Sequence, residues 1–381
     1  MEIYLDNSAT TKPYSNVVHT VSKCMIDFYG NPSSIHSHGE KAKKYLNECR
    51  GYIASTINAE SQEIIFTSGG SESNNFLLKG VLSKGSHLIT TNIEHSSILK
   101  CAAELEKKGI EVTYLKVDES GRINIDDLKS AMKPSTKLVS IMHVNNEIGV
   151  IQDIEAIGKA VKEYNENIKL HVDAVQSYGK LKIDVNKMNI DLLSLSAHKI
   201  HGPRGAGAAY IRGNTPVKAL IDGGGQEFGF RSGTENLPAI AGFTQASKQI
   251  HKNIEQNYLK VYKLRNYLVQ KLQNINGIKI NCRTDDDFLP YIVSISTIGI
   301  RSGKVLFYLN NEEIYISKSS ACSSRNLKDS HVLKAIGLRP EEIMGGLRIS
   351  FSEENSFEDV DILVYHMGKC LEKLRGEAAN E

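Results

Sequence analysis

Short β-rich runs alternate with amphipathic runs of helix length between about residue 40 and residue 212. This alternation is typical of a sheet with helices on both faces, so the segment is predicted to be an α/β unit. The predicted strands are Glu63–Thr67, His87–Thr91, Glu111–Leu115, Thr136–Met142, Lys169–Val172, Leu192–Ser196 and Ala208–Ile211. The predicted helices are Gly39–Ile57, Ser71–Leu82, Ser96–Lys107 and Ile154–Tyr164.

A second region begins with apolar residues spaced three to seven positions apart between Asn236 and Ile275. This spacing predicts one long amphipathic helix, with Pro238 near its start, that leads into a smaller C-terminal unit. The elements predicted in that unit are strands near Ile278–Ile280 and Tyr291–Ser296, a helix near Lys304–Leu309 and a last helix near Phe357–Leu374. We expect a large domain over residues 13–250 and a small domain formed by residues 1–12 and 251–381.

The composition excludes several classes of protein. The 381 residues are 40% hydrophobic and 24% charged, and the basic and acidic residues are spread evenly, which indicates a globular protein without direct nucleic-acid contact. No run approaches the roughly 20 apolar residues that cross a bilayer, and the chain starts without a charged and then apolar leader, so we expect a cytoplasmic protein. The six cysteines include no C-x-x-C pair, which argues against disulfides and metal clusters.

One predicted strand ends in Ser196, His198 and Lys199. Burial lowers the pKa of an amine and makes it nucleophilic, so Lys199 is a candidate Schiff-base residue. A lone lysine at a strand end more often faces solvent, so the residues around it have to decide.

A neighbouring predicted strand ends in Asp173. Open α/β sheets place ligands at the carboxyl ends of their strands, and an acid there suits the ring nitrogen of pyridoxal phosphate (PLP), whose protonated ring draws electrons from the substrate. Gln176, three residues further on, is a candidate partner for the ring hydroxyl oxygen. Taken alone, Asp173 fits the role of a strand-end cap equally well.

The segment Thr67–Ser73 follows a β-rich run and opens a helix. Its residues Gly70 and Ser71 would lie among backbone N–H groups at a helix N-terminus, which is an anion site by geometry and dipole. The segment lacks the Walker lysine and the G-x-G-x-x-G spacing, so a phosphate fits better than a nucleoside triphosphate or a dinucleotide. An ordinary turn with a serine cap is the simpler alternative.

Two more turns after predicted strands carry polar residues. His95 lies where an imidazole would stack on a pyridine ring and shuttle protons, although such a histidine is more often only a neighbour of a helix cap. Asn146, in the segment His143–Gly149, offers an amide to a substrate carboxylate or a ring oxygen. Several strand ends are therefore predicted to direct polar groups at one place.

Cys322 lies in a run of small polar residues, Ser317–Arg325, with cations nearby. This composition suits a mobile loop that carries an activated thiol, although a lone cysteine is more often an incidental surface residue. A thiol on a flexible segment is able to reach a substrate at the strand ends and then leave. We therefore predict a catalytic role for Cys322.

In their order along the chain, these segments resemble the class V aminotransferases and, within them, the NifS- and IscS-type cysteine desulfurases. The resemblance covers nearly the whole chain, from Tyr4–Thr11 and Gly30–His36 to Leu347–Ser352. It implies the PLP-dependent aminotransferase fold type I, with a mostly parallel seven-stranded sheet in the large domain and a smaller α+β domain. It also implies an enzyme that takes sulfur from L-cysteine, gives L-alanine and leaves a persulfide on Cys322.

The resemblance also implies a role for each site residue. Lys199, His95 and Cys322 would be catalytic, and Arg348, with Asn146, would bind the substrate, its guanidinium clamping the carboxylate. The implied cofactor contacts are Lys199, Gly70, Ser71, His95, Asn146, Asp173, Gln176, Ser196, His198 and, from the neighbouring subunit of a homodimer, Thr234. No metal is implied.

Other functions remain open from the sequence. A selenocysteine lyase or an aminotransferase of the same family would share Lys199 and Asp173 but would not need Cys322, whereas a non-catalytic scaffold would need none of them. The resemblance implies a sulfur-acceptor protein and leaves open whether it serves iron–sulfur cluster assembly, tRNA thiolation or thiamine synthesis. The chain has Ser319 where the related loops usually have glycine, a departure that bears on the reactivity of the thiol.

Overall fold

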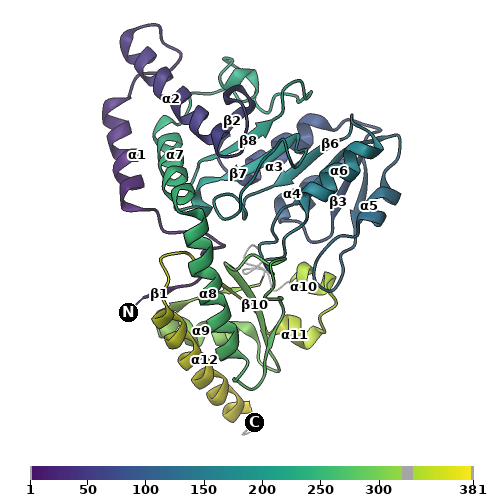
Figure 1. The fold of residues 1–381 in the computed structure, drawn as a ribbon, viewed down its shortest axis with the longest axis vertical. Helices are drawn as coiled ribbons and strands as arrows, with labels where there is room; N and C mark the ends of the chain where they lie inside the picture. Colours follow the sequence, from purple (N-terminus) through teal and green to yellow (C-terminus); the bar gives the residue numbers. More distant parts are fainter. Residues whose placement is uncertain (1, 320–328, 379–381) are drawn as a thin grey trace.

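The computed structural model describes residues 2–319 and 329–378, and its larger sheet has seven strands in the order β2-β8-β7-β6-β5-β3-β4 (Figure 1). The strands are β2 (Ile64–Thr67), β3 (His87–Thr91), β4 (Glu111–Leu115), β5 (Thr136–Met142), β6 (Lys169–Asp173), β7 (Leu192–Ser196) and β8 (Gly207–Ile211). The neighbours from β4 to β7 pair in parallel, and β8 is antiparallel to both β7 and β2. The predicted α/β class and mostly parallel sheet are confirmed.

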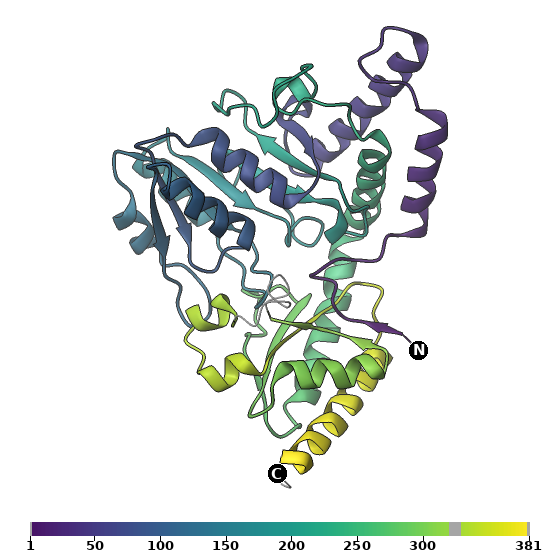
Figure 2. The same ribbon diagram turned by 180° about the vertical axis from the view of Figure 1, so that it is seen from behind.

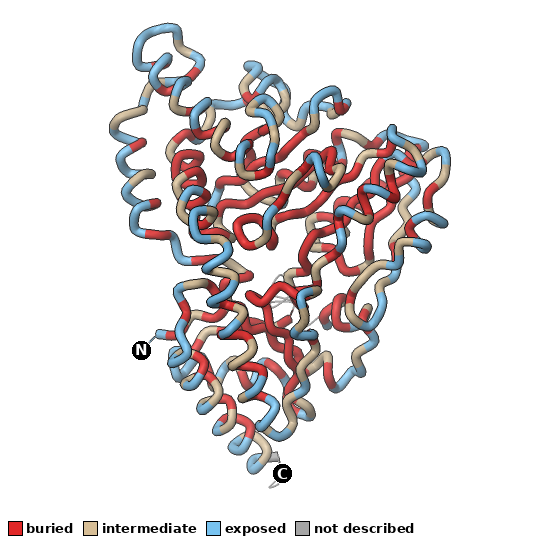
Figure 3. The backbone as a smooth tube through the Cα atoms, in the orientation of Figure 1, coloured by how far each residue is buried: buried red, intermediate tan, exposed pale blue. Residues whose placement is uncertain are grey.

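Alternating side chains explain why helices cover both faces of this sheet. In β2, Ile64 and Phe66 belong to one apolar core and Ile65 to the other. The first core is completed by α1 (Ser15–Asp27), α2 (Ser37–Ser55), α5 (Ile125–Ala131), α6 (Ile154–Tyr164) and α7 (Leu237–Lys252), and the second by α3 (Gly70–Val81) and α4 (Ser96–Glu106). The strands of the large sheet are deeply buried (Figure 3). Each isoleucine that is fully buried there contributes about 1.5–3 kcal/mol to stability.

A smaller antiparallel sheet lies at the other end of the molecule. Its order is β12 (Ser317–Lys318), β13 (Gly346–Ser350), β10 (Ile292–Thr297) and β9 (Ile278–Ile280). It shares a separate apolar core with α8 (Ile254–Leu272), α9 (Ser302–Asn311) and α12 (Phe357–Ala378). The short helices α10 (His331–Ala335) and α11 (Pro340–Met344) follow the undescribed segment.

The N-terminal arm joins the two ends of the molecule. Its first strand, β1 (Ile3–Tyr4), pairs in parallel with β11 (Ile314–Tyr315), so the N-terminus lies beside the small sheet (Figure 2). The arm then passes the end of β7, where the Thr11 N–H donates to the His198 carbonyl oxygen over 2.9 Å. It continues into α1, which packs against α7.

The prediction of a single helix from Asn236 to Ile275 is wrong. The chain forms α7 and α8 there, and Asn253 separates them with φ −125° and ψ 20°. The reason lies in the packing: Ile250 belongs to a core of the large sheet, whereas Val261 belongs to the core of the small sheet. The apolar spacing continues through the break because each half has an apolar face, but the two faces point at different cores.

Within the described residues, no helix is long and apolar enough to cross a membrane, and no group of three or more His, Cys, Asp or Glu side chains is arranged to hold a metal ion. The described cysteines are all buried and unpaired: Cys24, Cys49, Cys101, Cys282 and Cys370. Cys322 lies outside the described residues.

Candidate active site

A cavity of about 620 Å³ opens at the carboxyl ends of the parallel strands. This is the edge at which open α/β sheets bind ligands, because the loops that follow the strands converge there. Ten of the predicted site residues line it: Gly70, Ser71, His95, Asn146, Asp173, Gln176, Ser196, His198, Lys199 and Arg348. The N-terminal arm contributes Ser8, Ala9 and Thr10 to the same wall.

Lys199 ends a short 3₁₀ turn directly after β7. Its Nζ donates hydrogen bonds to the carbonyl oxygens of Ser8, at 2.5 Å, and Ala9, at 2.8 Å, so the N-terminal arm holds the amine at the cavity wall. Burial, together with the positive charge of Lys199, lowers the pKa of the neighbouring His198 to about 4. His198 is therefore neutral near pH 7, and its Nδ1 lies 3.2 Å from the Thr10 hydroxyl.

Asp173, the last residue of β6, is held by two hydrogen bonds. Its Oδ2 accepts from the side-chain amide of Asn74 over 2.7 Å, and its Oδ1 accepts from the Val175 N–H over 3.0 Å. Asn74 lies on α3 and also donates to the Ser97 hydroxyl over 2.8 Å. Sequence reasoning missed Asn74, because an asparagine inside a helix gives no signal that it faces a strand end about a hundred residues away.

The turn between β2 and α3 forms the glycine-lined part of the cavity. Gly69 precedes α3 with φ 148°, a conformation that favours glycine, and a Cβ on Gly70 would lie 2.5 Å from Cγ2 of Val175. Close to it, the Ser196 hydroxyl is buried and has no hydrogen-bond partner among the described residues. Buried hydroxyls are normally paired, so this one is available to a bound group.

His95 caps α4 and faces the cavity as well. Its Nδ1 accepts from the Ser97 N–H over 3.2 Å and lies 2.8 Å from the Ser97 hydroxyl. This pattern places the ring hydrogen on Nε2. The capping role and the predicted place at the site are therefore compatible.

Arg348, in β13, is fully buried at the side of the small sheet. Its two terminal nitrogens donate to the Asn146 carbonyl oxygen and to the Asp6 carboxylate, each over 2.8 Å. Its Nε is buried without a partner among the described residues. The guanidinium is thus fixed in orientation and keeps donors for one more acceptor.

Both ends of the undescribed segment that contains Cys322 are fixed beside this cavity. Before it, Ser317 in β12 pairs with Arg348 in β13. After it, the Ser330 hydroxyl donates to Glu147 over 2.5 Å, and His331 Nε2 lies 3.0 Å from the Glu94 carbonyl oxygen. Glu147 and Glu94 are adjacent in the sequence to Asn146 and His95, which line the cavity.

Thr234 is exposed on the loop that leads into α7 and does not contribute to the cavity wall of its own chain. The loop is held by Arg231, whose Nε lies 2.9 Å from Glu72 Oε1. A single chain therefore leaves Thr234 available to another molecule.

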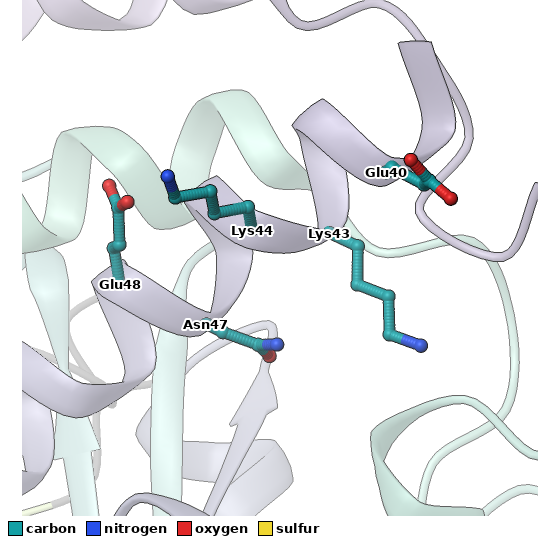
Figure 4. Close-up of a pocket in the computed structure, with 5 residues that line it drawn as sticks. All are labelled: Glu40, Lys43, Lys44, Asn47 and Glu48. Atoms are coloured by element: carbon teal, nitrogen blue, oxygen red, sulfur yellow. The ribbon is translucent and has the colours of Figure 1, made fainter. Parts of the chain in front are cut away.

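A second hollow, of about 520 Å³, lies on the outer surface of α2. Figure 4 shows the five side chains that line it, all from this one helix, spread along it without converging on a common point: Glu40, Lys43, Lys44, Asn47 and Glu48. All five are exposed. This hollow has the features of an ordinary charged helix surface.

The chain is similar to known proteins over nearly its whole length. Residues 3–363 match the family model described as aminotransferase class-V. The chain is 43% identical to a cysteine desulfurase IscS of Clostridium botulinum (98% of this chain, 95% of the relative) and 40% identical to the mitochondrial cysteine desulfurase of Saccharomyces cerevisiae (98% and 76%).

Solved structures give the same result. A NifS-like protein superposes with a TM-score of 0.92 at 36% identity, covering 98% of this chain and 100% of that one. A NifS-like protein of Rickettsia africae reaches a TM-score of 0.87 at 34% identity, with the same coverage. The resemblance seen in the sequence motifs is confirmed, and the chain belongs to the class V aminotransferase family.

Proposed function

We propose that this chain is a PLP-dependent cysteine desulfurase, which takes sulfur from L-cysteine and gives L-alanine and a persulfide on Cys322. The observation that carries the proposal is the single cavity at the strand ends, where Lys199, Asp173, His95 and Arg348 meet. Class V aminotransferases and cysteine desulfurases are PLP enzymes. The full-length identity to cysteine desulfurases supports the choice of reaction within that family.

The residues of the cavity fit PLP on features of their own. The unpartnered Ser196 hydroxyl and the glycine-lined N-terminus of α3 suit a phosphate. Asp173 suits a protonated ring nitrogen, and the buried Gln176 Oε1, which has no described partner, suits a hydroxyl at the ring. The volume of about 620 Å³ lies within the usual range for a small-molecule site.

When bound, PLP supplies an electron-withdrawing ring that stabilises negative charge at the substrate Cα. With PLP bound, Lys199 would hold the cofactor and would move the proton of the substrate Cα. Asp173, fixed by Asn74 and Val175, holds a proton at the ring nitrogen. Arg348 would bind the substrate carboxylate with those N–H groups that do not donate to Asn146 or Asp6.

The sulfur step belongs to Cys322. Its thiolate attacks the substrate sulfur, an S–S bond forms and the Cβ–S bond breaks, while the bonding electrons stay on the carbon fragment. Protonation of that fragment, with His95 and Lys199 as proton carriers, gives alanine. An acceptor protein then takes the sulfur from Cys322.

We also propose a homodimer in which Thr234 of one subunit completes the phosphate site of the other. The support is an exposed apolar surface on α1 and the segment after it: Met25 is 63% exposed, Ile26 73%, Tyr29 70% and Ile35 95%. Large apolar side chains that are exposed in one stretch of the chain favour a covered interface. The symmetry of a dimer would place the same surface on both partners.

The domain boundaries and the location follow as proposals. Residues 13–250 would form the large domain and residues 1–12 with 251–381 the small one, since separate apolar cores lie beside the two sheets. A reducing compartment such as the cytoplasm suits the buried, unpaired thiols of the described residues.

The test uses purified protein loaded with PLP, L-cysteine and a thiol reductant, and it measures alanine and sulfide together. We expect Cys322→Ala to lower the rate at least about 100-fold, because the nucleophile is lost. Cys24→Ala, a buried cysteine on α1, is the matched control and should keep the wild-type rate. Undiminished alanine and sulfide production by Cys322→Ala would contradict the persulfide step and favour a selenocysteine lyase, which a comparison of L-cysteine with L-selenocysteine would then decide.

A further inference from the structure

Lys199 lines a second, much smaller space as well as the main cavity. This space, of about 10 Å³, is also bordered by ionisable side chains: Lys180, His201, Tyr291 and Glu353. It has room for no more than about one water molecule, so these groups interact mainly with one another. None of them has a part in the chemistry described above.

His201 follows Lys199 by two residues and is held at both its backbone and its ring. Its φ is 63°, and its N–H donates to the Thr11 hydroxyl over 2.7 Å. Nδ1 lies 2.7 Å from the Lys12 carbonyl oxygen, which only accepts, and Nε2 lies 3.5 Å from Glu353 Oε1. Both ring nitrogens of His201 therefore face an acceptor, one a backbone carbonyl oxygen and the other a carboxylate.

Glu353 is the anion that faces this ring. Its carboxylate is 14% exposed, and it accepts a hydrogen bond from the Tyr14 hydroxyl, whose ring stacks on His201 at 4.3 Å. Burial would raise the pKa of Glu353, but the hydrogen bonds and the charge of His201 outweigh burial and lower it to about 2. The group is therefore ionised throughout the neutral range.

The charged form of Lys180 is stabilised by the same carboxylate, that of Glu353. Its amine is buried against the Tyr291 ring, 5.5 Å from the ring centre. Burial lowers its pKa to about 8, and the charge of Glu353 opposes that shift while the charge of Arg348 adds to it. Glu353 thus balances positive charge on two elements, the turn after β7 and the connection after β6.

The residues of this cluster come from the same segments of the chain as Lys199 and Arg348. Glu353 lies five residues after Arg348, and His201 two residues after Lys199. Tyr14 belongs to the N-terminal arm, whose residues Ser8 and Ala9 accept the hydrogen bonds of the Lys199 amine. The ion pair therefore joins the segment that leaves β13 to the turn that carries Lys199.

We propose that Glu353 is a positioning residue for Lys199, acting through His201 and Tyr14 to hold the lysine in register with Arg348. This inference rests on the proposed function, in which Lys199 moves a proton on a substrate that Arg348 binds. Small displacements of a reacting group cost up to about 100-fold in rate.

The decisive variant is Glu353→Gln, which keeps an oxygen for the Tyr14 hydroxyl but removes the negative charge. We expect kcat to fall about 10-fold while KM for L-cysteine stays within about two-fold, because the proton transfer suffers and the carboxylate contact does not. The absorbance change of the cofactor on Lys199 should move to a lower pH midpoint, because Glu353 no longer offsets the positive charge of Lys180 beside the lysine. Glu353→Asp should restore both values in part.

Glu354→Gln, at the exposed neighbouring position, is the matched control for loss of one charge and should leave both readouts at wild-type values. Tyr14→Phe keeps the stacked ring, removes one hydrogen bond and should shift kcat and the midpoint in the same direction by a smaller amount. If Glu353→Gln does not fold, Tyr14→Phe provides the test in its place.

A lowered melting temperature with unchanged kcat and midpoint would show a merely structural role for Glu353 and overturn the proposal. Equal effects of Glu353→Gln and Glu354→Gln would overturn it as well. Absence of desulfurase activity in the wild type would instead refute the proposed function, while the midpoint comparison would still test the role of Glu353.

Discussion

At the scale of single residues, Glu94 is a buried carboxyl group directly before His95. Its Oε1 accepts from the Thr91 hydroxyl over 2.8 Å and from the Met142 N–H over 3.0 Å, while Oε2 is buried without a described partner. Burial raises its pKa from 4.5 to about 8, and the charge of Asp173 acts in the same direction. The folded protein therefore holds a neutral acid next to His95 at neutral pH.

The raised pKa of Glu94 makes the stability of the folded chain depend on pH in one direction. Between pH 4.5 and 8 the unfolded chain ionises this group while the folded chain keeps it protonated, so stability is complete at low pH and is lost as pH rises towards 8. Glu94→Gln removes the ionisation, and we expect it to gain free energy of unfolding relative to the wild type between pH 5 and 8.5, on the order of 3 kcal/mol. Urea unfolding of the cofactor-free protein at several pH values measures it. A gap that stays constant with pH, or equals that of the exposed Glu119→Gln, would contradict the assignment.

Arg348 makes a prediction of a different kind. Its guanidinium reaches Asn146 and Asp6 with separate nitrogens, and a lysine has only one nitrogen to offer. Arg348→Lys should therefore raise KM for L-cysteine about 10- to 100-fold and lower the free energy of unfolding by about 1–3 kcal/mol. Steady-state kinetics and urea unfolding provide the two measurements. Arg339→Lys, at the exposed Arg339 that binds Glu342, is the control, and equal effects at the two positions would exclude a substrate contact.

The site residues differ in how far the sequence reveals them. Lys199, Asp173 and His95 lie within four residues after predicted strands, and parallel strands bring such positions to one edge. Ser8, Asn74 and Glu94 gave no such signal, because their contacts with the site depend on how the N-terminal arm, α3 and β5 pack. Periodicity reveals which side of an element is apolar but not which distant residue it meets.

At the scale of elements, the start of α3 lies close to the segment that follows β6, at the proposed phosphate site. Gly70→Ala would place a methyl group 2.5 Å from Val175, two residues after Asp173. We expect at least about a 10-fold loss of PLP affinity, since an overpacked contact costs about 1–3 kcal/mol. Titration of the apoprotein with PLP, followed by absorbance, measures this loss of affinity.

Val175→Ala should rescue the PLP affinity of the Gly70→Ala variant in part. Gly51→Ala is the control and should leave PLP affinity unchanged, because its Cβ on α2 would meet no atom within 4 Å. Failure of the rescue would place the effect elsewhere.

The helices and strands were predicted from the sequence with different accuracy. The strands of the large sheet lie within about one residue of their predictions. Except for the edge strand β4, they are short apolar runs that are mostly buried, and such runs have sharp polar limits. The break between α7 and α8 escaped prediction because Asn253 interrupts no apolar spacing. Helix α1 was not predicted, and its exposed Met25 and Ile26 blur the amphipathic pattern that would have revealed it.

At the scale of the whole molecule, the exposed Thr234 and the apolar surface on α1 lead to a prediction about two chains. If Thr234 completes the neighbour's phosphate site, then each PLP site combines Lys199 of one subunit with Thr234 of the other. Hybrid dimers separate the two contributions. One hybrid pairs a Lys199→Ala chain with a Thr234→Ala chain, and the second pairs a wild-type chain with a chain that carries both substitutions.

The two hybrids have the same composition of substitutions and differ only in their arrangement. In the first, the remaining Lys199 faces an intact Thr234 of the other chain, so we expect about half of the wild-type activity at limiting PLP. In the second, the remaining Lys199 faces a chain with the Thr234→Ala substitution, so the activity should fall to about half that of the Thr234→Ala homodimer. Co-expression with two different affinity tags isolates each hybrid, and PLP titration of both measures the affinity of the one remaining site. The reverse order of affinities would show that Thr234 serves the site of its own chain, and equal affinities would show that it serves neither.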